Sequence, residues 1–184
     1  MRYLASPAQL RASLIRWALF TIPLVVALGF LSGRSAGSGP DNPWFAALVK
    51  PAIFPPPAVF GIVWGILYVM MGLALAMVLA ARGAPGRGVA VLAFAVQLCV
   101  NLAWSPVFFA FHRIVAAQVI ILVLIPLVAL TIWLFWRVRT VAGALLLPYL
   151  AWVCFAAVLN YQFMQANPDA DGAFAPAQTV RVAI

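Results

Sequence analysis

The chain has 184 residues, of which 67% are apolar and 8% are charged, and its formal net charge is +8 at pH 7. A soluble domain of this length does not need so much apolar surface, and long charge-free stretches are typical of membrane spans. The basic residues do not form runs that could track a phosphate backbone, so the positive charge indicates contact with lipid headgroups and no nucleic-acid partner.

Five apolar windows without Lys, Arg, Asp or Glu follow one another, and each is long enough for one spanning helix of about 20 residues. Runs that are apolar on all sides exclude the alternating pattern of an outer-membrane barrel. We therefore predict an all-α membrane protein, a five-transmembrane-helix bundle forming a single domain over residues 1–184. The predicted helices are 17–33, 57–81, 88–111, 114–136 and 142–165, between an N-terminal tail at 1–16 and a C-terminal tail at 168–184.

The first window also resembles the apolar region of a secretory signal, because small residues follow it from Ser32 to Gly37. Arg34 lies directly behind the apolar run and favours a membrane span. Charge asymmetry then predicts a cytoplasmic N-terminus by the positive-inside rule, and the modest bias of seven basic residues against four leaves dual or opposite insertion open as alternatives. One side of the predicted bundle carries Arg2, Arg11, Arg16, Arg82, Arg87, Arg137 and Arg139, whereas the other carries Arg34, Lys50, Arg113, Arg181 and all three acidic residues.

The connection between the first two helices is the one long loop. Trp44, Phe45 and Leu48 can form a short amphipathic turn, and the prolines that follow force an extended backbone until a helix begins near Pro57. An aromatic loop over the end of a bundle is either a lid on a pocket or part of an interfacial aromatic belt.

Three predicted helices carry aromatic or amide side chains on one face, at spacings of three or four residues. An amide within hydrocarbon needs a hydrogen-bond partner, so these faces are expected to line the bundle interior and an aromatic pocket. The faces are Phe60, Trp64, Tyr68 and Met71 in the second helix, Gln97, Asn101, Trp104 and Phe108 in the third, and Tyr149, Trp152, Ala156 and Asn160 in the fifth. On the second helix, Gly61, Gly65 and Gly72 are expected to let a neighbouring helix approach closely.

Other conspicuous residues have simpler interpretations. Pro106 and Pro148 are expected to bend their helices, Cys99 and Cys154 to act as small apolar packing residues, and His112 to anchor a helix end at the membrane interface. The sequence offers no metal-ligand spacing and no set of residues for ordinary acid–base or hydrolytic catalysis, so no metal or catalytic residue is predicted.

Four short segments in a fixed order are spread over residues 44–160, a stretch of about two thirds of the chain. They are Trp44-Phe45-x-x-Leu48-x-Lys50-Pro51, Pro55-Pro56-x-x-x-Phe60-Gly61-x-Val63-Trp64-x-x-Leu67-Tyr68-x-x-Met71-Gly72, Gln97-Leu98-x-x-Asn101-x-x-Trp104-x-x-x-Phe108-Phe109, and Pro148-Tyr149-Leu150-x-Trp152-x-x-x-Ala156-x-x-Leu159-Asn160. With these segments the chain resembles the TspO/MBR family, the tryptophan-rich sensory or translocator proteins related to the peripheral benzodiazepine receptor.

The resemblance implies a five-helix bundle that commonly forms a homodimer. It also implies a pocket under the loop between the first two helices, which takes porphyrins and, in eukaryotic relatives, cholesterol and synthetic ligands. Trp64 and Trp152 match the family's pocket tryptophans. With the faces described above, the predicted ligand-binding residues are Trp44, Phe60, Trp64, Tyr68, Asn101, Trp104, Phe108, Trp152, Ala156 and Leu159.

The chain departs from the family pattern in the loop. Members usually have Trp in the segment Lys-Pro-x-Trp-x-Pro-Pro, where this chain has Ile53, and many have an aromatic residue where this chain has Ala58. No basic residue follows Tyr161 within five positions, so the proposed cholesterol motif is not present there.

Three functions are compatible with the sequence. The leading hypothesis is a membrane-embedded sensory or regulatory protein that binds a tetrapyrrole such as protoporphyrin IX or haem, with no required cofactor. The second is an enzyme that degrades porphyrin with light and oxygen, with Trp64 and Trp152 taking part in the electron chemistry. The third is a carrier of porphyrin, sterol or lipid, which five helices without internal repeats or intramembrane charges fit poorly.

Overall fold

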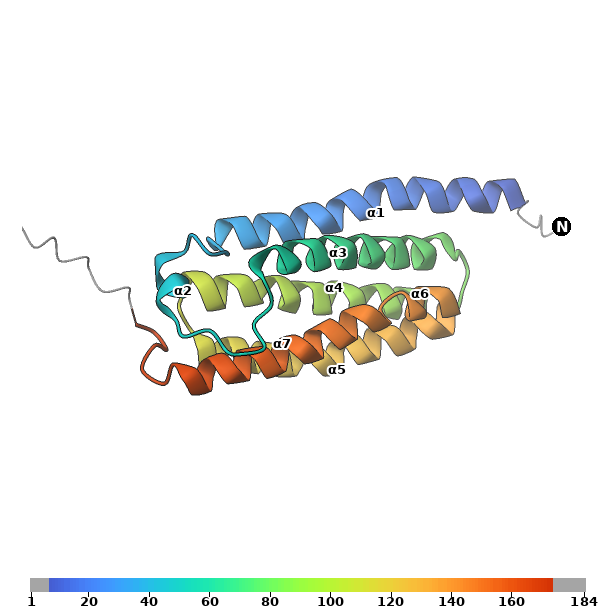
Figure 1. The fold of residues 1–184 in the computed structure, drawn as a ribbon. Coiled ribbons are helices and arrows are strands. Elements are labelled where there is room, and N and C mark those ends of the chain that lie inside the picture. Colours follow the sequence, from blue (N-terminus) through green and yellow to red (C-terminus); the bar gives the residue numbers. More distant parts are fainter. Residues whose placement is uncertain (1–6, 174–184) are drawn as a thin grey trace, which may run out of the picture.

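The computed structural model describes residues 7–173 and contains five long helices packed side by side into an elongated bundle (Figure 1). Each is long and apolar enough to cross a membrane, so the predicted fold class is confirmed. The predicted tails extend beyond the described residues, and Arg2 and Arg181 lie outside them. The elements are α1 (Pro7–Ser35), α2 (Pro43–Ala47), α3 (Pro57–Ala80), α4 (Arg87–Ser105), the π-helical η1 (Pro106–Ala110), α5 (Ile114–Val138), α6 (Thr140–Ala144) and α7 (Leu147–Ala166).

Prolines decide several helix boundaries. Pro57 occupies the first turn of α3, where its missing N–H group would have no intrahelical acceptor. Pro106 cannot donate the next hydrogen bond of α4, and the helix continues as the wider η1. Pro148 cannot donate to the carbonyl of Ala144, so the helix predicted at 142–165 is divided into α6 and α7.

The first helix begins at Pro7, whereas the sequence predicted a start at residue 17. The prediction began the helix after the last arginine of the N-terminal segment. Arg11 and Arg16 instead lie exposed on α1, which extends beyond the neighbouring helices at its N-terminal end (Figure 1). Long basic side chains can keep their charged heads in a polar environment without interrupting a helix, so Arg16 did not mark a boundary.

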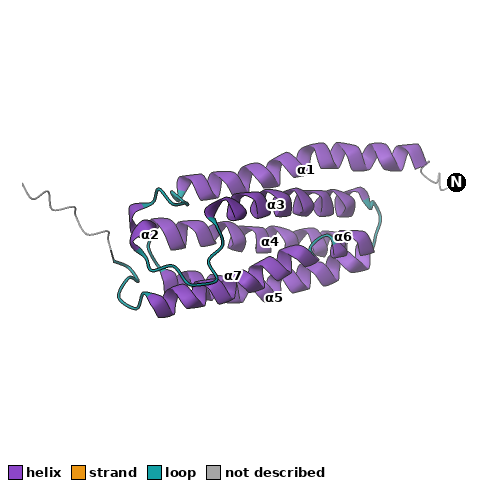
Figure 2. Cartoon of the chain, viewed as in Figure 1, coloured by secondary structure: helices purple, strands orange, loops and turns teal. Residues whose placement is uncertain are grey.

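The connections place the charges at two ends of the bundle. The α3–α4 turn, with Arg82 and Arg87, and the α5–α6 turn, with Arg137 and Arg139, lie at the end where α1 begins (Figure 2). The loop carrying α2 lies at the opposite end. The described basic residues in the connections therefore lie at the two ends of the bundle as the sequence predicted. The cytoplasmic location of the N-terminus stays a prediction.

The α1–α3 contact depends on one of the three glycines of the second predicted helix. A Cβ atom at Gly72 would lie 2.6 Å from the Cα atom of Ile22, and Thr21 Oγ1 donates a hydrogen bond to the Gly72 carbonyl at 2.7 Å. A Cβ atom at Gly61 or Gly65 would meet nothing within 4 Å. The expected close helix approach is therefore confirmed at Gly72, whereas no described helix of the same chain approaches Gly61 or Gly65 in this way.

Side chains fill the half of the bundle away from α2. Met71, Val78, Phe94, Val128 and Phe135 are buried in one apolar cluster, and the rings of Phe94 and Phe135 stack with centroids 5.7 Å apart. The two cysteines do not join this packing. Cys99 and Cys154, expected to be small apolar packing residues, are exposed on the outside of the bundle, because the faces of α4 and α7 that carry them point outward.

Candidate functional site

A pocket of about 590 Å³ lies in the half of the bundle that α2 covers. The closely packed helix pairs include α1 with α3, α4 with α5 and α5 with α7, but not α3 with α7, and the pocket occupies the space between these two helices and α4. Its volume is in the usual range for small-molecule sites, about 300–1,000 Å³. Nine predicted residues line it: Phe60, Trp64, Tyr68, Asn101, Trp104, Phe108, Trp152, Ala156 and Leu159.

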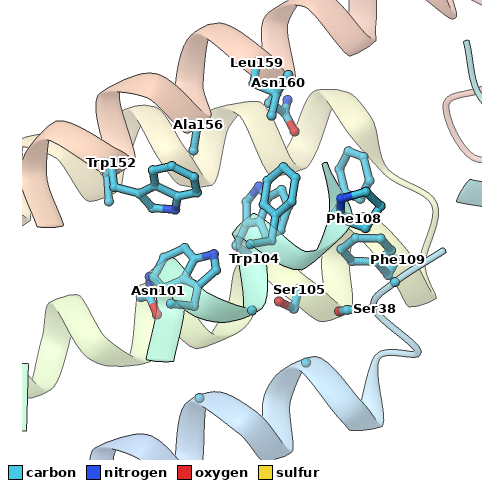
Figure 3. Close-up of a pocket in the computed structure, with 18 of the residues that line it drawn as sticks. Ser38, Asn101, Trp104, Ser105, Phe108, Phe109, Trp152, Ala156, Leu159 and Asn160 are labelled. Atoms are coloured by element: carbon cyan, nitrogen blue, oxygen red, sulfur yellow. The ribbon is translucent and has the colours of Figure 1, made fainter. Parts of the chain in front are cut away.

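The walls of the pocket are aromatic on three sides. Trp64 and Tyr68 stack along α3 with centroids 5.2 Å apart, and Trp104 and Phe108 stack along α4 and η1 at 5.1 Å. Figure 3 shows Trp152 and Ala156 on α7, across the pocket from Asn101 and Trp104 on α4. Ala156 has only a methyl group and leaves space beside the Trp152 indole, so the α7 wall can accommodate a flat molecule.

Hydrogen bonds between helices fix the polar groups of the site. Tyr68 Oη donates a hydrogen bond to Asn101 Oδ1 at 3.2 Å. Further from α2, the fully buried Tyr149 donates a hydrogen bond to Gln97 Oε1 at 2.9 Å. Asn160 Nδ2 donates to Gln118 Oε1 at 2.9 Å and joins α7 to α5. The amides expected to face the interior therefore do so, and each finds a partner on another helix, as a polar group in hydrocarbon requires.

The α2 segment packs over the pocket as a lid. Trp44, Phe45 and Leu48 are 4%, 7% and 7% exposed, which favours the lid interpretation over an interfacial belt. Phe45 lines the pocket, but Trp44 does not. The Trp44 ring lies behind the wall, edge-on to Phe108 at 5.4 Å and stacked on His112 at 4.5 Å, so Trp44 supports the wall rather than forming part of it.

Side-chain hydrogen bonds attach the lid and the loop to the rest of the bundle. Asn42 Oδ1 accepts from the N–H of Phe45 at 3.0 Å and caps α2, while Asn42 Nδ2 donates to the Phe109 carbonyl at 3.2 Å. Asn167, at the end of α7, exchanges two hydrogen bonds with the backbone of Val49, at 2.8 and 3.0 Å. The lid is therefore held from both the η1 side and the α7 side.

The pocket keeps its aromatic lining although the loop departs from the family pattern at Ile53 and Ala58. Ile53 is 41% exposed, Ala58 is exposed, and neither lines the pocket. Phe54, one residue after Ile53, lines it instead and contacts the rings of Phe60 at 5.3 Å and Phe163 at 5.7 Å. The aromatic character of the loop is therefore carried by Phe54.

The contribution of α1 to the pocket was not predicted. Val26, Gly29, Phe30 and Gly33 line it, and a Cβ atom at Gly29 would collide with the Tyr68 ring. The four-residue spacing of Gly29 and Gly33 is a signal that could have pointed to this face. It was missed because α1 carries no amide or aromatic stripe like those of the other helices.

The fold and the site together define a class: a multi-pass membrane protein in which a short helical lid covers an aromatic pocket. The TspO/MBR family model matches residues 21–165. Over 148 residues the chain is 42% identical to the tryptophan-rich protein TspO of Chlorobaculum tepidum, covering 80% of this chain and 93% of that protein. It is 38% identical over 151 residues to the tryptophan-rich sensory protein of Cereibacter sphaeroides, covering 82% and 92%.

The similarity extends to animal proteins. The human translocator protein is 36% identical over 155 residues, covering 79% of this chain and 92% of that protein. The chain therefore belongs to the TspO/MBR family, and the resemblance found in the sequence is confirmed.

Proposed function

We propose that the protein binds a tetrapyrrole, protoporphyrin IX or a haem-like molecule, in the pocket under α2, and that it acts as a sensory or regulatory protein. The observation that carries the proposal is the placement of Trp64, Trp104 and Trp152 around one cavity, on three different helices. A flat conjugated ring gains from stacked and edge contacts with such side chains, beyond the burial of its apolar area. The relative named as a tryptophan-rich sensory protein supports the regulatory role.

Protoporphyrin IX titrated in the dark into detergent-purified protein is expected to quench tryptophan fluorescence saturably. Trp152→Ala is expected to weaken binding about tenfold, because one ring contact is lost. The matched control is Trp133→Ala, since Trp133 is 53% exposed on α5 and does not line the pocket. Absorbance of the bound porphyrin gives a second readout that does not depend on the number of tryptophans. Unsaturable quenching, or an equal loss in both variants, would contradict the proposal.

Light-driven breakdown of the porphyrin is the second candidate function, favoured by the presence of both Trp64 and Trp152 in the lining of one pocket. Illumination of the same complex in air distinguishes binding alone from light-driven breakdown of the porphyrin. A stable porphyrin spectrum supports binding alone, whereas loss of the spectrum that depends on Trp64 or Trp152 supports turnover.

Filling the pocket from α7 provides an independent prediction. Ala156→Phe is expected to lower porphyrin affinity at least tenfold, because the new ring would occupy the space beside Trp152. The thermal midpoint should stay close to that of the unmodified protein, since the ring enters existing space. Val158→Phe on the same helix is the control, because Val158 is 52% exposed and outside the pocket lining. Unchanged binding in Ala156→Phe would place the ligand elsewhere.

A further inference from the structure

Among residues 7–173, one charged residue lines the pocket, Arg34 in the last turn of α1. The other lining residues are apolar, aromatic or neutral and polar. Two serine hydroxyls, those of Ser38 and Ser105, line the same cavity, and Figure 3 shows both on its α1 side. One edge of the pocket is therefore lined by an arginine and two serines, whereas most of the remaining lining is apolar or aromatic.

Lys50 and Arg113, the other lysine and arginine at this end of the described chain, already have partners. Lys50 Nζ donates to the carbonyls of Phe45 and Leu48 and lies 4.4 Å from the centroid of the Phe45 ring. Its partial burial lowers the pKa of the Lys50 ammonium group. Arg113 lies 4.0 Å from Asp171. Neither of these two residues lines the pocket.

Arg34 differs from both. Within residues 7–173 its guanidinium group makes no ion pair and no hydrogen bond, and it lies further than 4.0 Å from every described carboxylate, including that of Asp41. A basic residue in the last turn of a helix interacts favourably with the helix dipole. This interaction alone would not make the pocket prefer a charged ligand over a neutral one. Its place in the pocket lining adds a second role, because a guanidinium matches a carboxylate with two parallel N–H···O bonds.

We propose that Arg34 binds a carboxylate of the pocket's ligand, so that the pocket selects an anionic amphiphile over its neutral counterpart. The inference rests on the proposed tetrapyrrole function. The macrocycle would lie among the three pocket tryptophans, with its carboxylate-bearing edge toward Arg34, Ser38 and Ser105. The hydroxyl groups would donate further hydrogen bonds to the same anion.

The test compares protoporphyrin IX, which carries two carboxylates, with its dimethyl ester, which has the same ring and no charge. Both are titrated in the dark, at neutral pH and in the same detergent, into the unmodified protein, Arg34→Ala, Arg34→Lys and Arg16→Ala. Arg16→Ala is the matched control because Arg16 is an exposed arginine of the same helix that does not line the pocket. Binding of the ester to each variant reports whether the pocket is still folded.

The unmodified protein is expected to bind the diacid about tenfold more tightly than the ester, the effect of one charge-assisted contact. Arg34→Ala should abolish this preference by weakening diacid binding alone. Arg34→Lys should keep part of it, and Arg16→Ala all of it. Equal binding of diacid and ester to the unmodified protein, or an equal loss of both in Arg34→Ala, would overturn the inference and leave the proposed function standing. Failure of both ligands to bind the unmodified protein would overturn the proposed function as well.

Discussion

Gly72→Val is expected to lower the free energy of unfolding by about 2–3 kcal/mol, because the added side chain cannot fit between α1 and α3. The neighbouring atoms are backbone atoms of Thr21 and Ile22, which cannot move away as the end of a flexible side chain can. Separation of the helices would also break the hydrogen bond from Thr21 Oγ1 to the Gly72 carbonyl. The change is measurable as a shift in the unfolding midpoint in detergent, followed by circular dichroism.

Gly61→Val on the same helix is the matched control, since nothing lies within 4 Å of the position its Cβ atom would occupy. It is expected to leave the midpoint nearly unchanged. Equal destabilisation by the two substitutions would mean that loss of glycine, rather than the α1–α3 contact, controls stability.

Tyr149→Ala is expected to have the largest effect on stability, a loss of about 3–5 kcal/mol. Tyr149 is 0% exposed beneath the pocket, and its ring packs edge-on to Trp64 with centroids 6.2 Å apart. The substitution would leave a cavity and would also leave Gln97 Oε1 without its donor. The same unfolding measurement tests it, with Tyr161→Ala as the control, because Tyr161 lies on the same helix and is 50% exposed.

A double-mutant cycle separates the hydrogen bond from the packing. Tyr149→Phe alone should cost about 1–2 kcal/mol, because it keeps the ring but leaves the Gln97 carbonyl oxygen unpaired. Gln97→Leu in the same protein should recover part of this loss, since no buried amide would then lack a partner. Strict additivity of the two single changes would show that the Tyr149–Gln97 bond contributes nothing measurable.

Helical spacing was enough to predict which faces point inward. Residues three or four apart share a face, and an amide such as Asn101 or Gln97 cannot face lipid without a partner. The spacing does not say how far each residue lies along the bundle axis. Tyr68 and Trp64 therefore reach the pocket, whereas Met71 on the same stripe is buried in the packed half below it.

Several differences from the sequence prediction share a cause, because they depended on the position of a second element. A glycine permits close approach of another helix, but the sequence does not show which helix lies beside it. Gly61 and Gly65 could therefore not be distinguished from Gly72 by sequence. Trp44 lies behind the wall because of the way α2 docks on η1, which local sequence does not encode. The α1 face was missed because Phe30, 66% exposed, does not differ in type from a residue that faces only lipid.

The packed half of the bundle closes the cavity at the end away from α2. Beneath it, the Tyr149–Gln97 pair and the stacked Phe94 and Phe135 rings occupy the route toward α6. A molecule in this cavity would therefore have to enter and leave through the half of the bundle that carries α2. Passage to the opposite face of the membrane would require the packed side chains of this apolar cluster to separate. Within residues 7–173, the cavity ends in packed side chains and does not continue to the other end of the bundle.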